Sequence, residues 1–415
     1  MPGVSKWRFP TYPRPPGVRT GARDAGINEN GRERSAPEPL PSLTPLRGIA
    51  ALWVVLFHYC WHLPAVHPDR YTGAIYKGYL AVDLFFMLSG FVITHVYHRV
   101  FARQVTGQHY RDFLKARVAR IYPLHLTVLL VFVATVIAER ATVYVHGGSF
   151  APVPLVGERS LGAFLANLLM LQGIWARELS WNDPSWSISL EFLAYLLFPL
   201  VFPGLWRARP AAKAGIAAIL LVVLGWLAYR TGDDFNQWNG ISAIMRCLPE
   251  FLIGALLYST YRGRVLGSLL ATDTALFSGM LLLFVMLHFA APDFSIIPLF
   301  ALILLTAVAN KGRLGPLLNS TPFLWLGNIS YSLYLIHGFV LFVTIEVMRT
   351  GPGADFAKLP VNLSVALIIA MLAASLGLAS LSYRFVEVAG RRWVRGRLGV
   401  RRSALHLSAA GGRVA

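Results

Sequence analysis

The stretch Leu46-Arg-Gly-Ile-Ala-Ala-Leu-Trp-Val-Val-Leu-Phe-His58 is strongly apolar, yet it contains two ionisable side chains, Arg47 and His58. An α-helix turns by about 100° and rises by about 1.5 Å per residue, so these two positions share one face at a separation of roughly 16 Å. We predict that this stretch is the first membrane-spanning helix, with Arg47 at the membrane edge and His58 near the bilayer centre. An ionisable residue at that depth usually has a function.

The composition of the whole chain indicates an integral membrane protein. Of its 415 residues, 55% are hydrophobic and only 14% are charged, and apolar runs of spanning length recur along the chain. We therefore predict one all-α membrane domain over residues 43–390 with about ten transmembrane helices. The expected spans are 45–62, 78–98, 121–139, 186–205, 213–230, 241–260, 272–290, 295–310, 326–348 and 362–383. The apolar segment 161–171 is short for a span, and we expect it to be interfacial or re-entrant.

The net charge of +18 is concentrated beside the apolar segments. This distribution argues against nucleic acid as a partner and favours a lipid bilayer, because basic loops mark the cytoplasmic side of a membrane protein. With ten spans, the basic loops and both termini fall on that side. We expect a disordered basic cytoplasmic tail over residues 1–42 and a second basic cytoplasmic tail over residues 391–415.

The two cysteines, Cys60 and Cys247, both fall within predicted helices. Two separate cysteines provide neither a disulfide framework nor the Cys/His spacing that is typical of a metal site. We therefore expect neither disulfide bonds nor a bound metal.

Several ionisable residues fall inside the predicted spans at related depths. At about 1.5 Å per residue, Asp83, Glu191 and Arg246 lie near the outer face, and His58 and His337 lie near the middle. Isolated charges there are costly, so we expect these groups to line a wet cavity or to pair with each other. The simpler alternative is a set of structural ion pairs that only fix the packing of helices.

Helical spacing brings further polar groups onto common faces. Ser187 lies one turn before Glu191, and Ser330, Tyr334 and His337 fall on one stripe. These side chains are candidates for the lining of an active site. For Tyr334, the alternative is a packed ring whose hydroxyl bonds a neighbouring backbone carbonyl.

A pair of arginines, Arg117 and Arg120, precedes the third predicted span. Their spacing places both guanidinium groups on one side of a helix, and arginine suits bidentate contacts with phosphate. We consider them a phosphate clamp for a donor presented at the membrane surface. The alternative is an anchor that contacts lipid head groups.

Five motifs follow one another along the chain. They are Leu46-Arg47-Gly48 through His58, Gly78-Tyr-Leu-Ala-Val-Asp83-Leu-Phe-Phe-Met-Leu-Ser89-Gly90-Phe91, Arg117-Val-Ala-Arg120-Ile-Tyr122-Pro123, Pro184-Ser-Trp186-Ser187-Ile-Ser-Leu-Glu191 and Gly327-Asn-Ile-Ser330-Tyr331-Ser-Leu-Tyr334-Leu-Ile-His337. In this order they resemble the acyltransferase-3 family of bacterial membrane O-acyltransferases. The resemblance extends over nearly all of the membrane part. Near the C-terminus, Val388 follows Glu387 where the family often has proline.

The resemblance implies an enzyme of the bacterial inner membrane that moves an acyl group, usually acetyl, from acyl-CoA to a hydroxyl of a cell-surface or secreted glycan or glycolipid. A macrolide or lipid acceptor is the alternative. Acyl-CoA is a co-substrate, so no cofactor would be bound permanently. The implied catalytic residues are His58, Asp83, Glu191 and His337. The implied substrate-binding residues are Arg47, Arg117, Arg120, Tyr122, Trp186, Ser187, Arg246, Tyr331 and Tyr334.

The resemblance also divides the roles within this set. Arg47, Arg117 and Arg120 would bind the phosphates of CoA on the cytoplasmic side. His58 would act as a general base or carry the acyl group covalently, and Asp83 or Glu191 would orient its imidazole. Tyr334 and His337 would serve the acceptor or the oxyanion.

A transporter or flippase for a glycan or lipid precursor is the alternative function, because buried polar residues also line substrate and proton paths. Such proteins commonly contain paired repeats with helices interrupted by glycine or proline, and this sequence has no internal repeat. The arginine pair favours a donor that carries phosphate.

Overall fold

The computed structural model describes residues 40, 43–102, 104–147, 154, 157–175, 181–232, 235–237, 240–263, 267–350 and 358–399. Every regular element in these residues is a helix, which confirms the predicted all-α fold. Apart from Leu40, the predicted N-terminal tail over residues 1–42 lies outside the described residues. Residues 400–415 of the predicted C-terminal tail also lie outside them.

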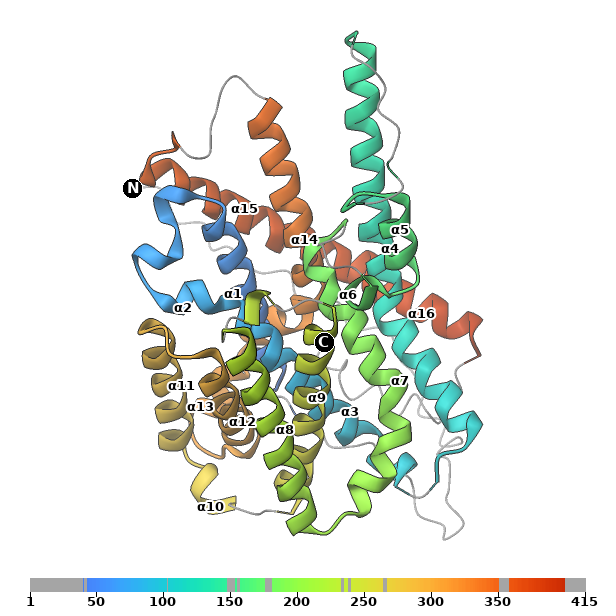
Figure 1. Ribbon diagram of the computed structural model, residues 1–415, viewed down its shortest axis with the longest axis vertical. Coiled ribbons are helices and arrows are strands. Elements are labelled where there is room, and N and C mark those ends of the chain that lie inside the picture. The colour runs from blue at the N-terminus through green and yellow to red at the C-terminus, as the bar shows by residue number, and fades with distance from the viewer. Residues whose placement is uncertain are drawn as a thin grey trace, which may run out of the picture. The chain divides into compact units, whose positions relative to one another are not determined.

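A helix coincides with each of the ten predicted spans (Figure 1). Among the described residues, eight helical segments are long and apolar enough to cross a membrane, which makes the chain a multi-pass membrane protein. They contain α1 (Leu43–Trp61), α3 (Ala81–Phe101), α4 (Gly107–Val145), α7 (Trp186–Arg207), α8 (Pro210–Thr231), α9 (Ile241–Arg262), α14 (Thr321–Thr350) and α15 (Val361–Ser382). The other two predicted spans are the shorter helices α11 (Asp273–His288) and α12 (Asp293–Ala309). A total of ten crossings and the side of the termini therefore stay predictions.

Short helices fill the connections. They are η1 (Pro64–Val66), η2 (Pro68–Arg70), α2 (Gly73–Tyr76), η3 (Lys77–Leu80), α5 (Leu161–Leu168), α6 (Gln172–Trp175), η4 (Asp183–Ser185), η5 (Phe235–Gln237), α10 (Gly267–Leu270) and α13 (Leu314–Leu318). The segment that we expected to be interfacial or re-entrant forms α5 and the start of α6. With eight residues, α5 has a length of only about 12 Å, too short to cross a bilayer.

Glycines allow α3 and α9 to cross at close range. A Cβ atom at Gly90 would lie 1.9 Å from the carbonyl oxygen of Phe251, and one at Gly254 would lie 2.0 Å from that of Met87. Only glycine leaves room for backbones this close, as is common where membrane helices pack. The glycine of the second sequence motif is therefore a packing residue.

Glycines also allow α1 and α14 to pack at close range. A Cβ atom at Gly48 would lie 2.6 Å from the backbone nitrogen of Gly327, and one at Gly327 would lie 2.1 Å from the carbonyl oxygen of Thr44. This close contact fixes the first and last motifs relative to each other. Because Arg47 and His58 lie on α1 and His337 lies on α14, it also fixes the site.

The chain turns after α15 through a π-helical segment, Tyr383–Glu387, and continues as α16 (Val388–Arg397). A π-bulge in a helix often accompanies a functional site. α16 packs against α4 (Figure 1), where a Cβ atom at Gly390 would lie 2.6 Å from Cβ of Pro123. Residues 391–397 of the predicted basic tail are thus part of an ordered helix.

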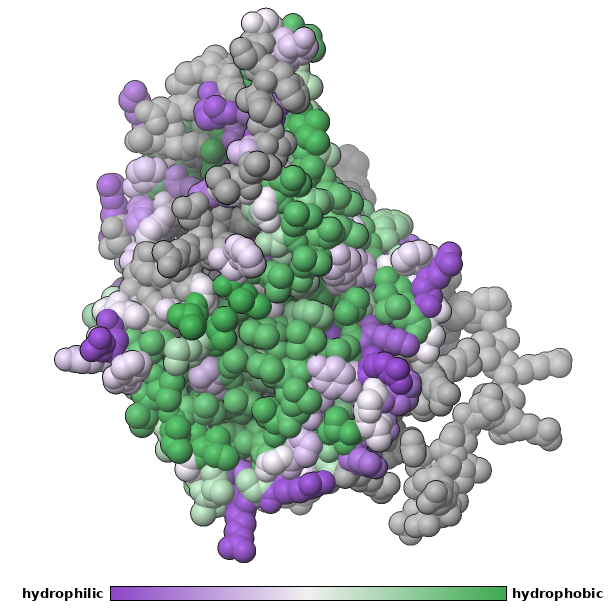
Figure 2. Space-filling model, turned by 45° about the vertical axis from the view of Figure 1, so that its right-hand side comes forward, coloured by the Kyte–Doolittle hydropathy of each residue, from purple (hydrophilic) through white to green (hydrophobic). Residues whose placement is uncertain are grey.

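Figure 2 shows one face of the molecule on which apolar side chains form a broad, nearly continuous surface. Large apolar side chains are also exposed along several of the long helices, among them Leu130 and Ile137 of α4, Leu200 of α7 and Val222 of α8. Exposed apolar surface of this extent is typical of contact with lipid.

Candidate active site

His58 and His337 face each other across the contact of α1 and α14, with ring centroids 4.9 Å apart. His58 is partly exposed, whereas His337 is fully buried. The neighbouring Tyr59 donates to the carbonyl oxygen of His337 at 3.3 Å and bonds the hydroxyl of Ser375 at 2.6 Å, which connects α1, α14 and α15. The structure thus brings two predicted catalytic histidines together and leaves His58 accessible.

Backbone carbonyls determine the tautomer of both imidazoles. Nδ1 of His58 lies 2.9 Å from the carbonyl oxygen of Val54, and Nδ1 of His337 lies 3.2 Å from that of Leu333. A carbonyl only accepts hydrogen bonds, so Nδ1 carries the proton and the neutral ring keeps a lone pair on Nε2. The imidazole of His58 is therefore oriented by its own helix among the described residues, where the two predicted carboxylates, Asp83 and Glu191, bond to other side chains.

His337 does not have the arrangement expected of an oxyanion-binding group. Its Nε2 atom is buried and has no hydrogen-bond partner among the described residues. Because Nδ1 holds the proton in the neutral ring, Nε2 has none to donate to an oxyanion. Its position behind His58 suits a neighbour that limits how the reactive ring can move.

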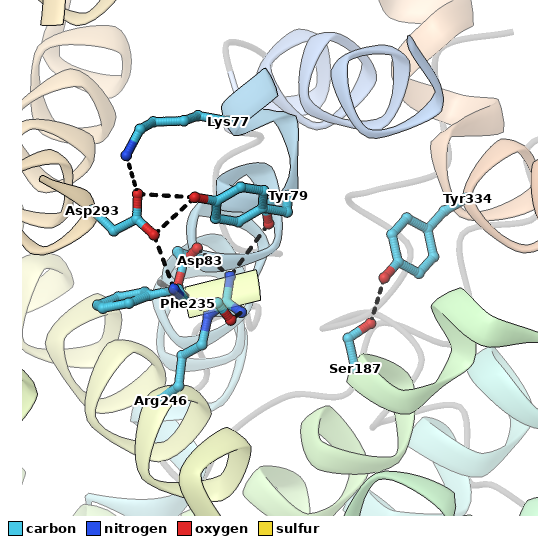
Figure 3. Close-up of polar contacts among 8 residues, drawn as sticks. All are labelled: Lys77, Tyr79, Asp83, Ser187, Phe235, Arg246, Asp293 and Tyr334. Carbon is cyan, nitrogen blue, oxygen red and sulfur yellow. Dashed lines mark hydrogen bonds and ion pairs between the residues drawn. The ribbon is translucent and has the colours of Figure 1, made fainter. Parts of the chain in front are cut away.

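Tyr334 lies with Ser187 on the far side of the interior from the charged groups described next (Figure 3). Their hydroxyls are 2.7 Å apart, and the hydroxyl of Tyr334 donates to the carbonyl oxygen of Pro184 at 2.9 Å. This is the packed arrangement that we considered as the alternative for Tyr334. The pair connects α14 to the start of α7.

Asp83 and Arg246 form a fully buried bidentate ion pair (Figure 3). Nε and Nη2 of Arg246 each lie 2.6 Å from a carboxylate oxygen of Asp83, and the guanidinium also donates to the carbonyl oxygens of Tyr79 and Phe235. Arg246 is thus engaged with α3, η3 and η5 and has 1% of its surface exposed. This pair matches the alternative of structural ion pairs that fix helix packing, and the predicted catalytic role of Asp83 and substrate-binding role of Arg246 stay predictions.

A second buried pair extends this group. Lys77 donates to Asp293 at 2.5 Å, Tyr79 donates to both oxygens of the same carboxylate, and the backbone nitrogen of Phe235 donates to it at 2.9 Å. Since Arg246 binds the carbonyl of Phe235, both polar backbone groups of this residue are held by buried charges (Figure 3). We call Lys77, Tyr79, Asp83, Arg246 and Asp293 the ion-pair network.

Glu191 lies apart from the ion-pair network. It accepts hydrogen bonds from Ser89 and Tyr195, both at 2.5 Å, and it interacts electrostatically with Arg47 and Arg117. The shared depth predicted for Glu191 and Asp83 therefore does not bring them together. Glu191 belongs to the end of the site that contains the arginines.

Arg47 is partly buried at the start of α1 and forms no hydrogen bond or ion pair with any described residue. Its guanidinium interacts electrostatically with Glu191, Tyr195 and Tyr383. A partly buried arginine without a bonded partner is costly, so this group is available for an anionic ligand.

Arg117 is surrounded by aromatic rings. Its guanidinium lies 5.4 Å from the ring centre of Tyr97 and 5.8 Å from those of Phe113 and Tyr195, and it donates to the hydroxyl of Tyr97. Its Nε is buried without a hydrogen-bond partner in the described part of the chain. The rings hold the side chain in place while leaving donors for a ligand.

Arg120 differs from its neighbour because it is paired. It forms an ion pair with Glu387 of the π-helical segment, and Glu387 also accepts a hydrogen bond from Ser332 at 2.9 Å. Its guanidinium lies 5.4 Å from the ring centre of Tyr331. Arg120 therefore binds the turn before α16 as well as facing the other arginines.

The remaining predicted binding residues have structural contacts. Tyr122 donates to the carbonyl oxygen of Leu168 and Tyr331 to that of Ile121. Trp186 lies beside the ion-pair network, because the guanidinium of Arg246 is 5.6 Å from the centre of its indole ring. All three are partly exposed, so they can also contact a substrate.

Sequence reasoning missed three residues that the structure adds to the site. Glu387 pairs with Arg120, Arg391 lies near the same arginines, and Glu250 is fully buried beside Asp83 and Arg246. The position of Glu250, one turn along α9 from Arg246, was a readable signal. Nothing local to Arg391 indicates its neighbours.

Comparisons with known proteins agree with this geometry. The family model described as an acyltransferase domain matches residues 40–384, which include every predicted site residue. The chain belongs to the acyltransferase-3 family. Acyltransferase MdmB of Streptomyces mycarofaciens is 31% identical over 378 residues, covering 84% of this chain and 90% of that protein. A putative peptidoglycan O-acetyltransferase of Bacillus subtilis, YrhL, is 26% identical over 84% of this chain and 54% of its own length.

A third relative is the O-acetyltransferase OatA of Staphylococcus aureus, 24% identical over 86% of this chain and 58% of its own length. The chain therefore spans little more than half the length of the second and third relatives. No solved structure matches. As a member of the acyltransferase-3 family with O-acetyltransferase relatives, the protein is an O-acyltransferase.

Proposed function

We propose that the protein transfers an acetyl group from acetyl-CoA to a hydroxyl of a cell-surface or secreted glycan or glycolipid. One observation carries the proposal: a single face of α1 holds the unpaired guanidinium of Arg47 at one end and the accessible Nε2 of His58 roughly 16 Å further along. An anion site and a base at this separation fit a donor whose phosphates and thioester are joined by a long arm.

The donor's phosphates bind at the start of α1. Arg47 and Arg117 both keep donors that no described residue uses, and Arg120 lies beside them. Guanidinium groups bind phosphate oxygens through charge-assisted, often bidentate hydrogen bonds. The extended arm of CoA then follows α1 towards His58.

His58 acts as the general base in the reaction. Nε2 takes the proton of the acceptor hydroxyl while the oxygen attacks the thioester carbonyl. The carbon–sulfur bond then breaks, and the imidazolium returns its proton to the departing thiolate, which gives an acetyl ester and CoA with a free thiol. A covalent acetyl-imidazole route would use the same lone pair.

We also propose the placement of this reaction in a bacterial inner membrane, with the arginines facing the cytoplasm. The positive-inside rule assigns to that side the helix ends that carry the basic residues Arg207, Arg209, Lys213 and Arg262. The acceptor approaches from the opposite end, near Trp61.

Replacing His58 by alanine tests the proposal. In membranes supplied with radiolabelled acetyl-CoA, we expect label transfer to glycan to fall by about 10²–10⁴-fold, the usual contribution of a general base. Label retained on the wild-type protein after rapid denaturation at neutral pH, and released by hydroxylamine, would instead indicate the covalent route.

The matched control is His146→Ala. His146 makes the same hydrogen bond, from Nδ1 to the carbonyl four residues earlier, but it is exposed at the far end of α4. This variant should keep wild-type transfer. Undiminished transfer in His58→Ala, in protein that is folded and inserted, would overturn the proposal.

A further inference from the structure

Aromatic rings gather at the end of α1, one turn beyond His58. Trp61 is the last residue of α1, so it lies about 4.5 Å further along the helix axis than His58. Its indole lies 5.6 Å from the ring of Phe57, 4.9 Å from that of His67 and 5.6 Å from that of Tyr76, measured between ring centroids. Phe57 also contacts the ring of His58, at 5.0 Å. We call Trp61, His67 and Tyr76 the aromatic platform.

The connection between α1 and α3, which carries two of these rings, is fixed by hydrogen bonds. Nε1 of Trp53 on α1 donates to the carbonyl oxygen of Ala74 at 2.6 Å and so holds α2, the helix that contains Tyr76. The hydroxyl of Thr72 lies 3.0 Å from Nδ1 of His288 at the end of α11. The aromatic platform is therefore preorganised, and a ligand that stacks on it has little side-chain entropy to overcome.

Exposed hydrogen-bonding groups lie beside the aromatic platform. Trp61 keeps 36% of its surface exposed. The next residue, His62, is exposed, and its Nδ1 lies 2.8 Å from the carbonyl oxygen of His58. Because a carbonyl only accepts, Nδ1 of the neutral ring carries the proton and Nε2 is an acceptor. Arg70 on the same connection is exposed, and its side chain forms no hydrogen bond or ion pair with any described residue.

This combination fits a sugar ring better than an aliphatic chain. A pyranose has C–H groups on its faces and hydroxyls around its edge, so it can stack on an aromatic ring while its hydroxyls bond polar neighbours. An aliphatic ligand would use the indole of Trp61 but not Nε2 of His62. The position also fits, because the rise from His58 to Trp61 is smaller than the width of a sugar with its hydroxyls. A sugar stacked on Trp61 can therefore present a hydroxyl to His58.

An aromatic belt at the lipid interface is the other common use of a tryptophan at the end of a membrane helix. Trp226 of α8 has the properties of such a residue, since it is 56% exposed and contacts no other aromatic ring in the described part of the chain. Trp61 instead contacts three rings, two of which come from the connection between α1 and α3. Its surroundings are those of a ligand site beside the proposed base.

We propose that the aromatic platform is the acceptor subsite and that Trp61 stacks on a pyranose ring of the acceptor. The inference rests on the proposed transfer to a glycan or glycolipid, and it assigns recognition of the sugar to Trp61. The platform forms and breaks no covalent bond. It makes the enzyme selective for hydroxyls carried by a sugar over those of aliphatic alcohols.

Saturation-transfer difference NMR tests the aromatic platform without a donor. The full chain in phosphatidylcholine nanodiscs is mixed with methyl β-D-glucopyranoside, whose ring hydroxyls are all equatorial, and the signal from empty nanodiscs is subtracted. We expect the wild type to saturate the axial ring protons of this sugar much more strongly than glycerol, a polyol without a ring. Trp61→Leu should weaken sugar binding by about tenfold, on the scale of one aromatic contact. Trp61→Phe should keep most of the binding because it keeps a ring.

The matched control is Trp226→Leu, which removes an exposed indole from another helix and should keep wild-type sugar binding. Each variant should also bind radiolabelled acetyl-CoA as the wild type does, since Trp61 lies at the opposite end of α1 from Arg47. That binding shows that the variant is folded. Methyl β-D-glucopyranoside should inhibit transfer of label to glycan by the wild type, which connects the aromatic platform to the acceptor.

Equal saturation of the sugar by the wild type and Trp61→Leu, or none by either, overturns the inference and leaves acyl transfer from acetyl-CoA in place. Equal losses in Trp61→Leu and Trp226→Leu also overturn it, because they indicate a general effect of interfacial tryptophans. A wild type that binds the sugar through Trp61 but does not bind acetyl-CoA supports the aromatic platform and refutes the proposed donor.

Discussion

At the scale of single residues, buried charge in this protein has two distinct uses. In the ion-pair network, each charged group meets an opposite charge and backbone donors or acceptors. At Arg47, Arg117 and Arg120, which we call the arginine cluster, Arg47 has no bonded partner in the described residues. Satisfied charges fix a structure, and unsatisfied ones mark where a ligand compensates them. Function is therefore to be sought at the cluster and at His58.

Removing one member of the ion-pair network should damage stability more than chemistry. We expect Arg246→Met to destabilise the protein by about 3–5 kcal/mol, because Asp83 keeps a buried charge without its partner. Thermal unfolding of the detergent-solubilised protein measures this loss. The double variant Asp83→Leu, Arg246→Met should recover part of it, since Asp83 is no longer left without its partner.

Arg349→Met provides the comparison for that measurement. Arg349 pairs with Glu139 and Glu346, but 61% of its side chain is exposed, and water screens such pairs. Its removal should shift the unfolding temperature little. If both variants lose equal stability, the distinction between buried and exposed pairs fails for this protein.

At the scale of helices, two glycine contacts hold the site together. Gly48 and Gly327 fix α1 against α14, and Gly90 and Gly254 fix α3 against α9. The first contact sets the distance between His58 and His337, and the second brings Asp83 to Arg246. Three of the five motifs that resemble the acyltransferase-3 family thus contain glycines used in packing.

Gly254→Ala should separate α3 from α9. The added methyl group would lie 2.0 Å from the carbonyl oxygen of Met87, a rigid backbone atom, so the helices must move apart. We expect the free energy of unfolding to fall by about 1–3 kcal/mol, the usual cost of overpacking. Gly377→Ala on α15 meets no atom within 4 Å and should leave stability unchanged or slightly raised. Differential scanning fluorimetry compares the two, and equal unfolding temperatures would contradict the role of Gly254.

The helices could be predicted from sequence because hydropathy is a local property. Each apolar run that we expected to span coincides with a helix. The pairing of polar groups was less predictable. The position of a residue along a helix gives its depth in the membrane, but not the side of the helix on which its side chain lies. Asp83 and Glu191 share a depth, yet one faces Arg246 and the other faces Ser89.

The C-terminal helix shows a second limit. Residues 391–397 are polar and basic, which predicts a tail, but packing of Gly390 on Pro123 makes them part of α16. That contact joins segments more than 260 residues apart, and no local pattern reports it. The tertiary contact therefore places α16 against α4, the helix that carries Arg117 and Arg120.

At the scale of the whole molecule, the line from the arginine cluster to His58 gives the enzyme a direction across the membrane. Under the proposed function the donor is acetyl-CoA, which is charged and cannot cross a bilayer, so we expect it to enter from the side on which the arginine cluster opens. The Trp61 end of α1 is left for the acceptor, and exposed aromatic residues such as Tyr71 gather there. Under the proposed function, one active site would thus serve substrates from two compartments.

We therefore predict that acetyl-CoA is used from one side of the membrane only. Two variants each add one exposed cysteine, Arg397→Cys at the end of α16 and Tyr71→Cys beyond α1. They identify the two faces with a membrane-impermeant maleimide, since the native Cys60 and Cys247 are buried. In sealed vesicles, acetyl-CoA should support acetylation only from the side on which the α16 reporter reacts. In right-side-out vesicles from cells, that reporter should be protected and the Tyr71→Cys reporter labelled, because the basic loops remain in the cytoplasm. Use of acetyl-CoA from the Tyr71 side would mean that the cluster and His58 do not form one path, and the assignment of the arginines to the donor would have to be abandoned.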